Sequence, residues 1–144
     1  MGIETLMLQA TTAKAVELAF ARLRSDRAKA IYVASGPLGP VKRAWIIALA
    51  EDSRLPVIYS FRIFAIEGGL ISFAADYGDL FRRAAGYVDK ILKGSHPADL
   101  PVAPRKFGLI INLNAARSLD LKIPPAILAR ADEVIDQTTE IDRS

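Results

Sequence analysis

Apolar positions in the first sixty residues alternate between short runs and helical spacing. A short apolar segment at 3–9 predicts a strand. Thr11 and Thr12 follow it as candidate N-caps of a helix whose apolar residues recur three and four positions apart. The run 30–34 is apolar throughout, which is typical of a strand covered on both faces. A second helix is predicted between this run and the extended segment 57–60, so the predicted order is β-α-β-α-β.

The alternation of predicted strands and helices ends after residue 60. Residues 61–66 are mostly apolar, the glycine pair at 68–69 predicts a turn, and 70–73 predicts another short strand. No helix fits between these segments. A long amphipathic helix is predicted over 79–93, and Gly94 stands where a helix commonly ends on a left-handed residue.

The remaining third of the chain predicts shorter elements. Prolines in the loop 96–104 argue against regular structure there, and 107–112 predicts one more buried strand. Asn114 is a candidate cap for a short helix, and a further helix is expected around 126–129. Residues 131–136 are either its continuation or an edge strand.

These elements together predict an α/β fold, with a mainly parallel sheet, right-handed crossovers and helices on both faces. We divide the chain into a β-α-β-α-β unit over 1–78 and a return segment over 79–136. The return segment comprises a helix, a proline-rich loop, a strand and short helices. The polar tail 137–144 is expected to fray.

Composition excludes several kinds of chemistry. The 144 residues include no Cys and one His, which argues against disulfides, thiol catalysis, a metal centre or a His-based triad. The net charge of +3 does not demand a nucleic-acid partner. The loop 35–39 lacks the glycine spacing of nucleotide-binding motifs, so no cofactor is expected. No set of acid, base and nucleophile is evident, and we expect a protein that is not an enzyme.

Several motifs support a more specific hypothesis. The run Gly68-Gly69-Leu70-Ile71-Ser72-Phe73 is followed by the runs 79–94 and 97–102, and then by the segments 107–112, 121–125 and 128–135. In that order they resemble the closing region of ABC-transporter substrate-binding proteins. These are two-lobed type I periplasmic binding proteins related to branched-chain and aromatic amino-acid receptors. The similarity extends from about Val16 to Asp136 and covers the later part of such proteins, which are longer than this chain.

The resemblance implies the substrate-binding component, or a truncated remnant, of an ABC transport system for a small solute such as an amino acid. It also implies an ABC permease as partner and a periplasmic location. The first residues lack a charged n-region, a long apolar run and a cleavage site, so as written the chain is expected to be cytoplasmic.

Candidate ligand-binding residues stand at the predicted strand ends. Hydroxyls would donate hydrogen bonds, phenylalanine rings would stack on the solute, and Asp76 would pair with an ammonium group. Turn formation, packing or capping would also explain each of these residues. The candidates are Ser35, Gly36, Ser60, Phe61, Ser72, Phe73 and Asp76.

An alternative function is a stand-alone oligomerising α/β module with no transport ligand. The apolar face of the helix at 79–93 needs a cover, and a second copy of the chain could supply it. We therefore expect a homodimer or larger assembly with this helix in the interface. The stretches 61–69 and 97–104 are candidate hinges for exchanging segments between subunits.

Overall fold

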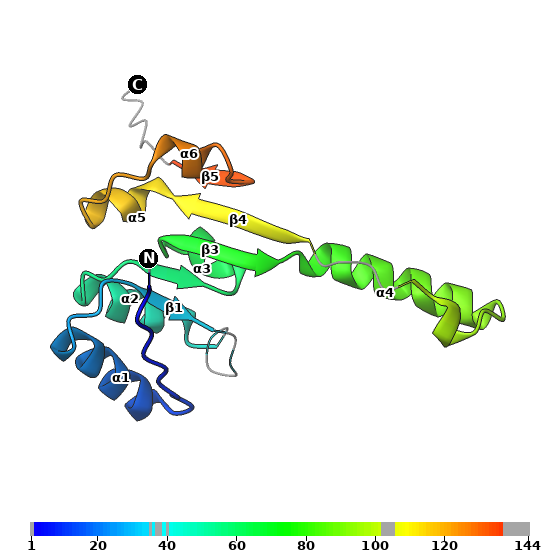
Figure 1. Cartoon of the computed structure of the whole chain (residues 1–144), viewed down its shortest axis with the longest axis horizontal. Helices are drawn as coiled ribbons and strands as arrows, with labels where there is room; N and C mark the ends of the chain where they lie inside the picture. The colour runs from blue at the N-terminus through cyan, green and yellow to red at the C-terminus, as the bar shows by residue number, and fades with distance from the viewer. Residues whose placement is uncertain (1, 35, 37–38, 40, 102–105, 137–144) are drawn as a thin grey trace, which may run out of the picture.

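The computed structural model describes residues 2–34, 36, 39, 41–101 and 106–136. The described part contains a five-stranded sheet of order β1-β2-β3-β4-β5 (Figure 1). Neighbouring strands run parallel except for β3 and β4, which pair antiparallel. The predicted α/β fold with a mainly parallel sheet is confirmed. The strands are β1 (Ile31–Val33), β2 (Val57–Tyr59), β3 (Ile71–Ala75), β4 (Phe107–Asn112) and β5 (Glu133–Ile135).

The helices α1 (Ala13–Ser25), α2 (Arg43–Asp52) and α3 (Arg62–Ile66) build the main core on one face of the sheet. Thr12 caps α1 as predicted, because its Oγ1 accepts a hydrogen bond from the Ala15 amide at 3.2 Å. The buried residues of this core come from all three helices and from β2. They are Val16, Phe20, Ile46, Ile47, Ala50, Val57, Tyr59 and Phe64.

A smaller core lies on the opposite face, against α5 (Leu113–Ser118). Ala115 and Ala116 pack with Leu70 and Ile71, and Ile71 points away from the main core because successive strand residues face opposite sides. The prediction of helices on both faces therefore holds. The short helix α6 (Pro125–Leu128) leads from α5 to β5, which resolves 131–136 in favour of the edge strand.

Asn112, and not the predicted Asn114, caps α5. The Asn112 Oδ1 accepts hydrogen bonds from the amides of Asn114 and Ala115 at 2.9 and 3.1 Å. Its Nδ2 donates to the Ala65 carbonyl in α3 at 2.9 Å. Asn112 ends β4 directly before the helix, so its side chain reaches the first free amides and also joins the two faces of the sheet.

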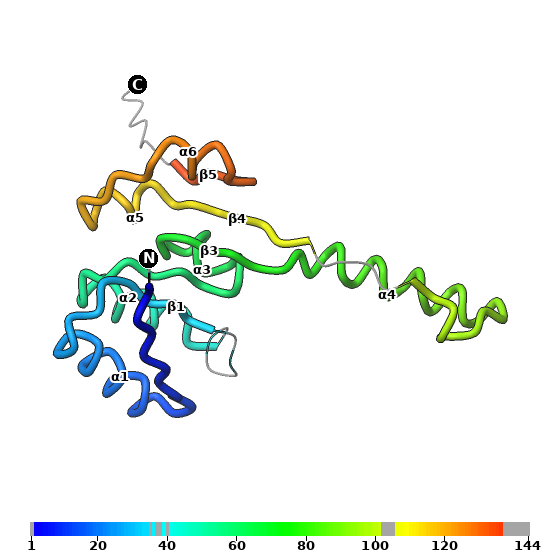
Figure 2. Tube along the Cα trace, in the orientation of Figure 1, coloured from blue at the N-terminus to red at the C-terminus, as the bar shows by residue number. Residues whose placement is uncertain are grey.

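The long helix α4 (Tyr77–Leu92) runs away from the sheet, and the segment after it returns alongside (Figures 1 and 2). A 3₁₀ turn at Pro97–Asp99 lies on the return path, and the Tyr87 hydroxyl donates to the Pro101 carbonyl at 2.6 Å. We call residues 77–101 the arm. The helix predicted over 79–93 is confirmed to within two residues, and Gly94 has a φ of 97° as expected of its C-terminal position.

Two further predictions about secondary structure were wrong. Residues 3–9 form no strand, and Ile3, Leu6 and Met7 are exposed. The stretch 61–69 contains α3, which is too short to give a periodic signal but buries Phe64 and Ala65. The expected fraying of 137–144 falls outside the described residues.

Candidate functional site

The carboxyl ends of β1, β2 and β3 lie at one edge of the sheet, which we call the carboxyl edge. Gly36 follows β1, Ser60 and Phe61 follow β2, and Asp76 follows β3. The Ser60 amide donates to the Val33 carbonyl at 3.2 Å, so the ends of β1 and β2 stay together. Open α/β sheets commonly bind small molecules at this edge. Ser35, another candidate, lies outside the described residues.

The loop after β1 lies against the end of β2. The Gly39 amide donates to the Gly36 carbonyl at 3.2 Å. Gly39 is buried, and a Cβ placed on it would lie 3.8 Å from the Phe64 ring and 3.9 Å from the Phe61 ring. Phe61 also packs on the main core, so its ring is held between the core and this loop.

Phe61 stacks on Tyr77, the first residue of α4. The ring centroids are 5.9 Å apart and the ring planes differ by 15°. Tyr77 remains 44% exposed in this arrangement. Sequence reasoning did not single out Tyr77, although an aromatic residue directly after the candidate Asp76 could have marked it. The stack of Phe61 on Tyr77 connects the end of β2 to the start of the arm.

Asp76 caps α4, which was the alternative reading of this residue. Its Oδ1 accepts a hydrogen bond from the Asp79 amide at 3.0 Å, and its own amide donates to the Lys106 carbonyl at 2.9 Å. The backbone hydrogen bond from Asp79, together with the charges of Arg82 and Lys106, lowers the pKa of Asp76 below its ordinary value. Its carboxylate is exposed and ionised at neutral pH, so ammonium pairing stays a prediction.

Ser72 and Phe73 point to opposite faces of β3. Ser72 is 0% exposed and stands beside Tyr59 under the main core, so its hydroxyl does not reach the carboxyl edge. Phe73 is half-exposed on the other face and stacks on Phe107 of β4, with ring centroids 5.2 Å apart. The structure therefore groups Gly36, Ser60, Phe61 and Asp76 at the carboxyl edge and places Ser72 in the core.

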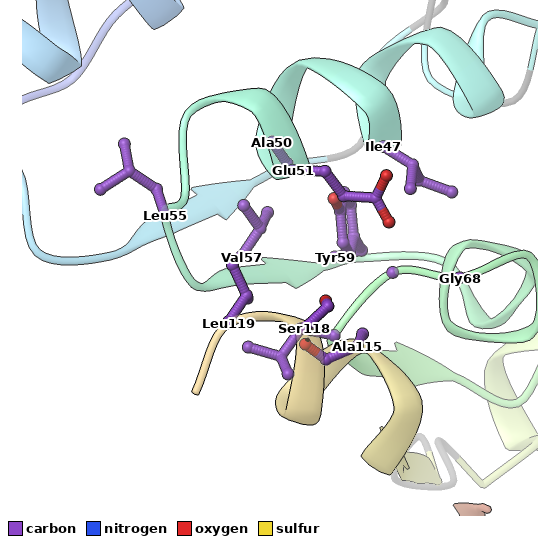
Figure 3. A pocket seen from close by; sticks show the side chains of 12 residues that line it. Ile47, Ala50, Glu51, Leu55, Val57, Tyr59, Gly68, Ala115, Ser118 and Leu119 are labelled. Carbon is purple, nitrogen blue, oxygen red and sulfur yellow. Dashed lines mark hydrogen bonds between the residues drawn. The ribbon is translucent and has the colours of Figure 1, made fainter. Parts of the chain in front are cut away.

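A shallow depression lies toward the opposite end of the strands (Figure 3). Its lining includes Glu51, Tyr59 and Ser118, and the other lining residues are mainly apolar. Burial, with a smaller effect of the Glu51 charge, raises the pKa of Tyr59. A neutral phenol in an apolar surround indicates core packing at this end of the sheet.

Within the described ranges, no group of three or more His, Asp or Glu side chains is placed to hold a metal ion. Over the same residues, no helix combines the length and apolar character needed to cross a membrane.

A family model described as "ABC transporter substrate binding protein" matches residues 1–135. The chain belongs to this family. The resemblance inferred from the sequence is thereby confirmed, and this family comprises binding proteins, not enzymes. No curated protein sequence matches the chain significantly.

Two solved structures of similar fold are more than 25% identical to this chain over the matched region. A conserved domain protein from Vibrio cholerae is 28% identical, with a TM-score of 0.72 over 87% of this chain and 42% of its own. An ABC domain from Streptococcus pneumoniae in complex with L-Trp is 27% identical, with a TM-score of 0.71 over 85% of this chain and 40% of its own. The chain thus spans less than half the length of each of these two proteins.

A third structure shows the fold alone. A ligand-free, open substrate-binding protein with adhesive properties from Clostridium difficile is 22% identical, with a TM-score of 0.63 over 89% of this chain and 43% of its own.

Proposed function

We propose that the carboxyl edge forms one wall of a binding site for a small solute, in the substrate-binding component of an ABC transport system. The observation that supports this most is the grouping of Gly36, Ser60, Phe61 and Asp76 at the ends of three adjacent parallel strands in a chain of this family. An ABC permease is the corresponding partner, and the location is outside the cytoplasm.

An amino acid is the solute that this edge suits best. Asp76 offers an ionised carboxylate for an ammonium group, Phe61 offers an aromatic surface, and Gly36 is exposed. The relative from Streptococcus pneumoniae was solved with L-Trp, which agrees with this chemistry. A site needs two walls to desolvate its ligand, so we expect this wall alone to bind an amino acid weakly.

Saturation-transfer NMR on the purified chain tests this proposal, because it detects weak complexes. We expect transfer to at least one aromatic amino acid. Asp76→Asn should weaken binding several-fold, because asparagine preserves the helix cap but removes the charge. The matched control Asp120→Asn, on the turn after α5, should change nothing. Absence of transfer to every common amino acid from the folded chain would contradict the proposal.

We also propose that the chain self-associates through α4. No residue of this 16-residue helix is buried, and its exposed apolar residues follow helical spacing. The same face supported the alternative of an oligomerising module without a transport ligand, which the amino-acid experiment separates from a binding protein. Beyond Tyr77 at its start, the exposed apolar residues of α4 are Leu80, Phe81, Val88, Ile91 and Leu92.

Analytical ultracentrifugation tests self-association. We expect more than one chain per particle at micromolar concentration, and Val88→Glu should shift the particle toward the monomer. Val41→Glu places the same charge at an exposed valine outside α4 and should leave the assembly intact. A wild-type monomer at every concentration would contradict self-association.

A further inference from the structure

The described part of the chain contains two tyrosine–phenylalanine stacks, and they differ in how far they are exposed to solvent. Tyr59 and Phe64 stack with centroids 4.5 Å apart, and each is 1% exposed. Phe61 and Tyr77 also stack nearly parallel, but the Tyr77 side chain stays 44% exposed. The first pair fills the core. The second pair presents ring surface to solvent at the carboxyl edge, which core packing does not explain.

We propose that Phe61 and Tyr77 form an aromatic platform on which the ring of an aromatic solute stacks, and that Tyr77 determines specificity for such solutes. The inference rests on the proposed binding function and assigns a residue and a ligand class to the same edge. Stacked aromatic pairs gain free energy beyond the burial of their apolar area. A solute with an aromatic ring therefore gains more from this platform than an aliphatic solute of similar size.

The platform is fixed before a ligand arrives. Phe61 is held by the main core and by the approach of Gly39 to its ring. Tyr77 is held by the first turn of α4, in which the Asp76 carboxylate accepts from the Asp79 amide. The Asp76 amide in turn donates to the Lys106 carbonyl and ties this turn to the start of β4. Because both rings are already ordered, binding loses little side-chain entropy.

Charge next to the platform fits an amino acid. Asp76 directly precedes Tyr77, so an ionised carboxylate stands beside the exposed ring. Arg82 and Lys106 face the same carboxylate and can attract the solute's own carboxylate. One aromatic amino acid could thus place its ring on Tyr77 and its charged groups beside residues of opposite sign.

Exposed aromatic side chains elsewhere provide the matched control. Tyr32 is the middle residue of β1 and is 62% exposed. It belongs to neither of the two stacks. Tyr32→Leu removes an exposed tyrosine ring, as Tyr77→Leu does, but at a position outside the platform.

The test compares the affinities of L-tryptophan and L-leucine, measured by chemical-shift titration for the wild type and three variants. Tyr77→Leu should lower the preference for L-tryptophan over L-leucine about two- to tenfold, because it removes the stacking gain but keeps an apolar side chain. Tyr77→Phe should retain the preference, and so should Tyr32→Leu. Circular dichroism establishes that each variant keeps its helix content.

The outcomes separate the platform from the proposed function. If the wild type binds both amino acids and Tyr77→Leu leaves the preference unchanged, the platform is wrong and solute binding stands. If the folded wild type binds neither amino acid, both inferences are wrong. A loss of preference in Tyr32→Leu equal to that in Tyr77→Leu would also overturn the assignment to Tyr77.

Discussion

The helices α1 and α4 have the same kind of amphipathic sequence but opposite surroundings. The 13-residue α1 buries Val16 and Phe20 against α2 and the sheet. The 16-residue α4 is longer and buries no residue. Helical spacing of apolar residues therefore establishes that a helix has an apolar face, but does not identify what covers that face. In this chain α1 packs in the main core, whereas α4 is part of the arm and has no buried residue.

The candidate site lies where these two regions meet. Phe61 is anchored in the packed region and Tyr77 begins the arm, so their stack connects the two. A change in the position of the arm relative to the sheet would move one ring against the other. The following predictions compare matched residues of the two regions, beginning with the largest effect.

Replacement of a phenylalanine by alanine should give the largest difference in stability between the two regions. Phe20→Ala in α1 should lower the free energy of unfolding by about 3–5 kcal/mol, since Phe20 is 5% exposed within the main core. Phe81→Ala in α4 should cost less than about 1 kcal/mol, since Phe81 is 71% exposed. Urea denaturation of the dilute proteins measures both. Equal costs would show that α4 is packed as α1 is.

Two glycine-to-alanine substitutions should change the stability by smaller amounts and in opposite directions. A Cβ on Gly69 would lie 2.6 Å from the Tyr59 ring and 2.8 Å from the Phe64 carbonyl, so Gly69→Ala should destabilise the fold by about 1–3 kcal/mol. Gly86 lies within α4 with nothing within 4 Å of such a Cβ. Gly86→Ala should therefore increase the stability of α4 by about 0.5–1 kcal/mol. Thermal denaturation followed by circular dichroism measures both, and a stabilising Gly69→Ala would contradict the close packing.

The smallest effect concerns the cap at the junction. The pKa of Asp76 is lowered in the folded chain, so its contribution to stability is fully present above the unfolded pKa of about 3.9. That contribution is lost as the pH falls through the lower folded value. Asp76→Ala should reduce the helix content of α4 at neutral pH, whereas Asp76→Asn should preserve it. Helix content that is identical in all three proteins would argue against the cap.

Much of the fold could be predicted because it depends on local pattern. The apolar runs at 30–34 and 107–112 gave β1 and β4, and the spacing over 79–93 gave α4. The errors arose where tertiary contacts decide the outcome. α3 is stabilised by burial of Phe64 and Ala65 against the sheet, and 3–9 has strand-like composition but pairs with no strand in the described residues.

The candidate site was predictable in position but not in detail. The rule that ligands bind at the carboxyl ends of parallel strands selected Ser60, Phe61 and Asp76. It could not separate Ser72 from Phe73, because a one-residue step along a strand changes the face. Tyr77 was missed because its proposed role depends on stacking with Phe61, which is distant in sequence but close in space.

Amide hydrogen exchange across a dilution series tests most directly whether α4 lacks cover within its own chain. In dilute solution, the amides of β2 and β3 should exchange about 100-fold more slowly than those of α4, because core amides open only with much of the global stability. Concentrating the protein should slow exchange in α4 while leaving β2 and β3 unchanged, since a second copy then covers the helix. Protection of α4 equal to that of β3 at every concentration would contradict the account, because it would mean that the helix packs against its own sheet.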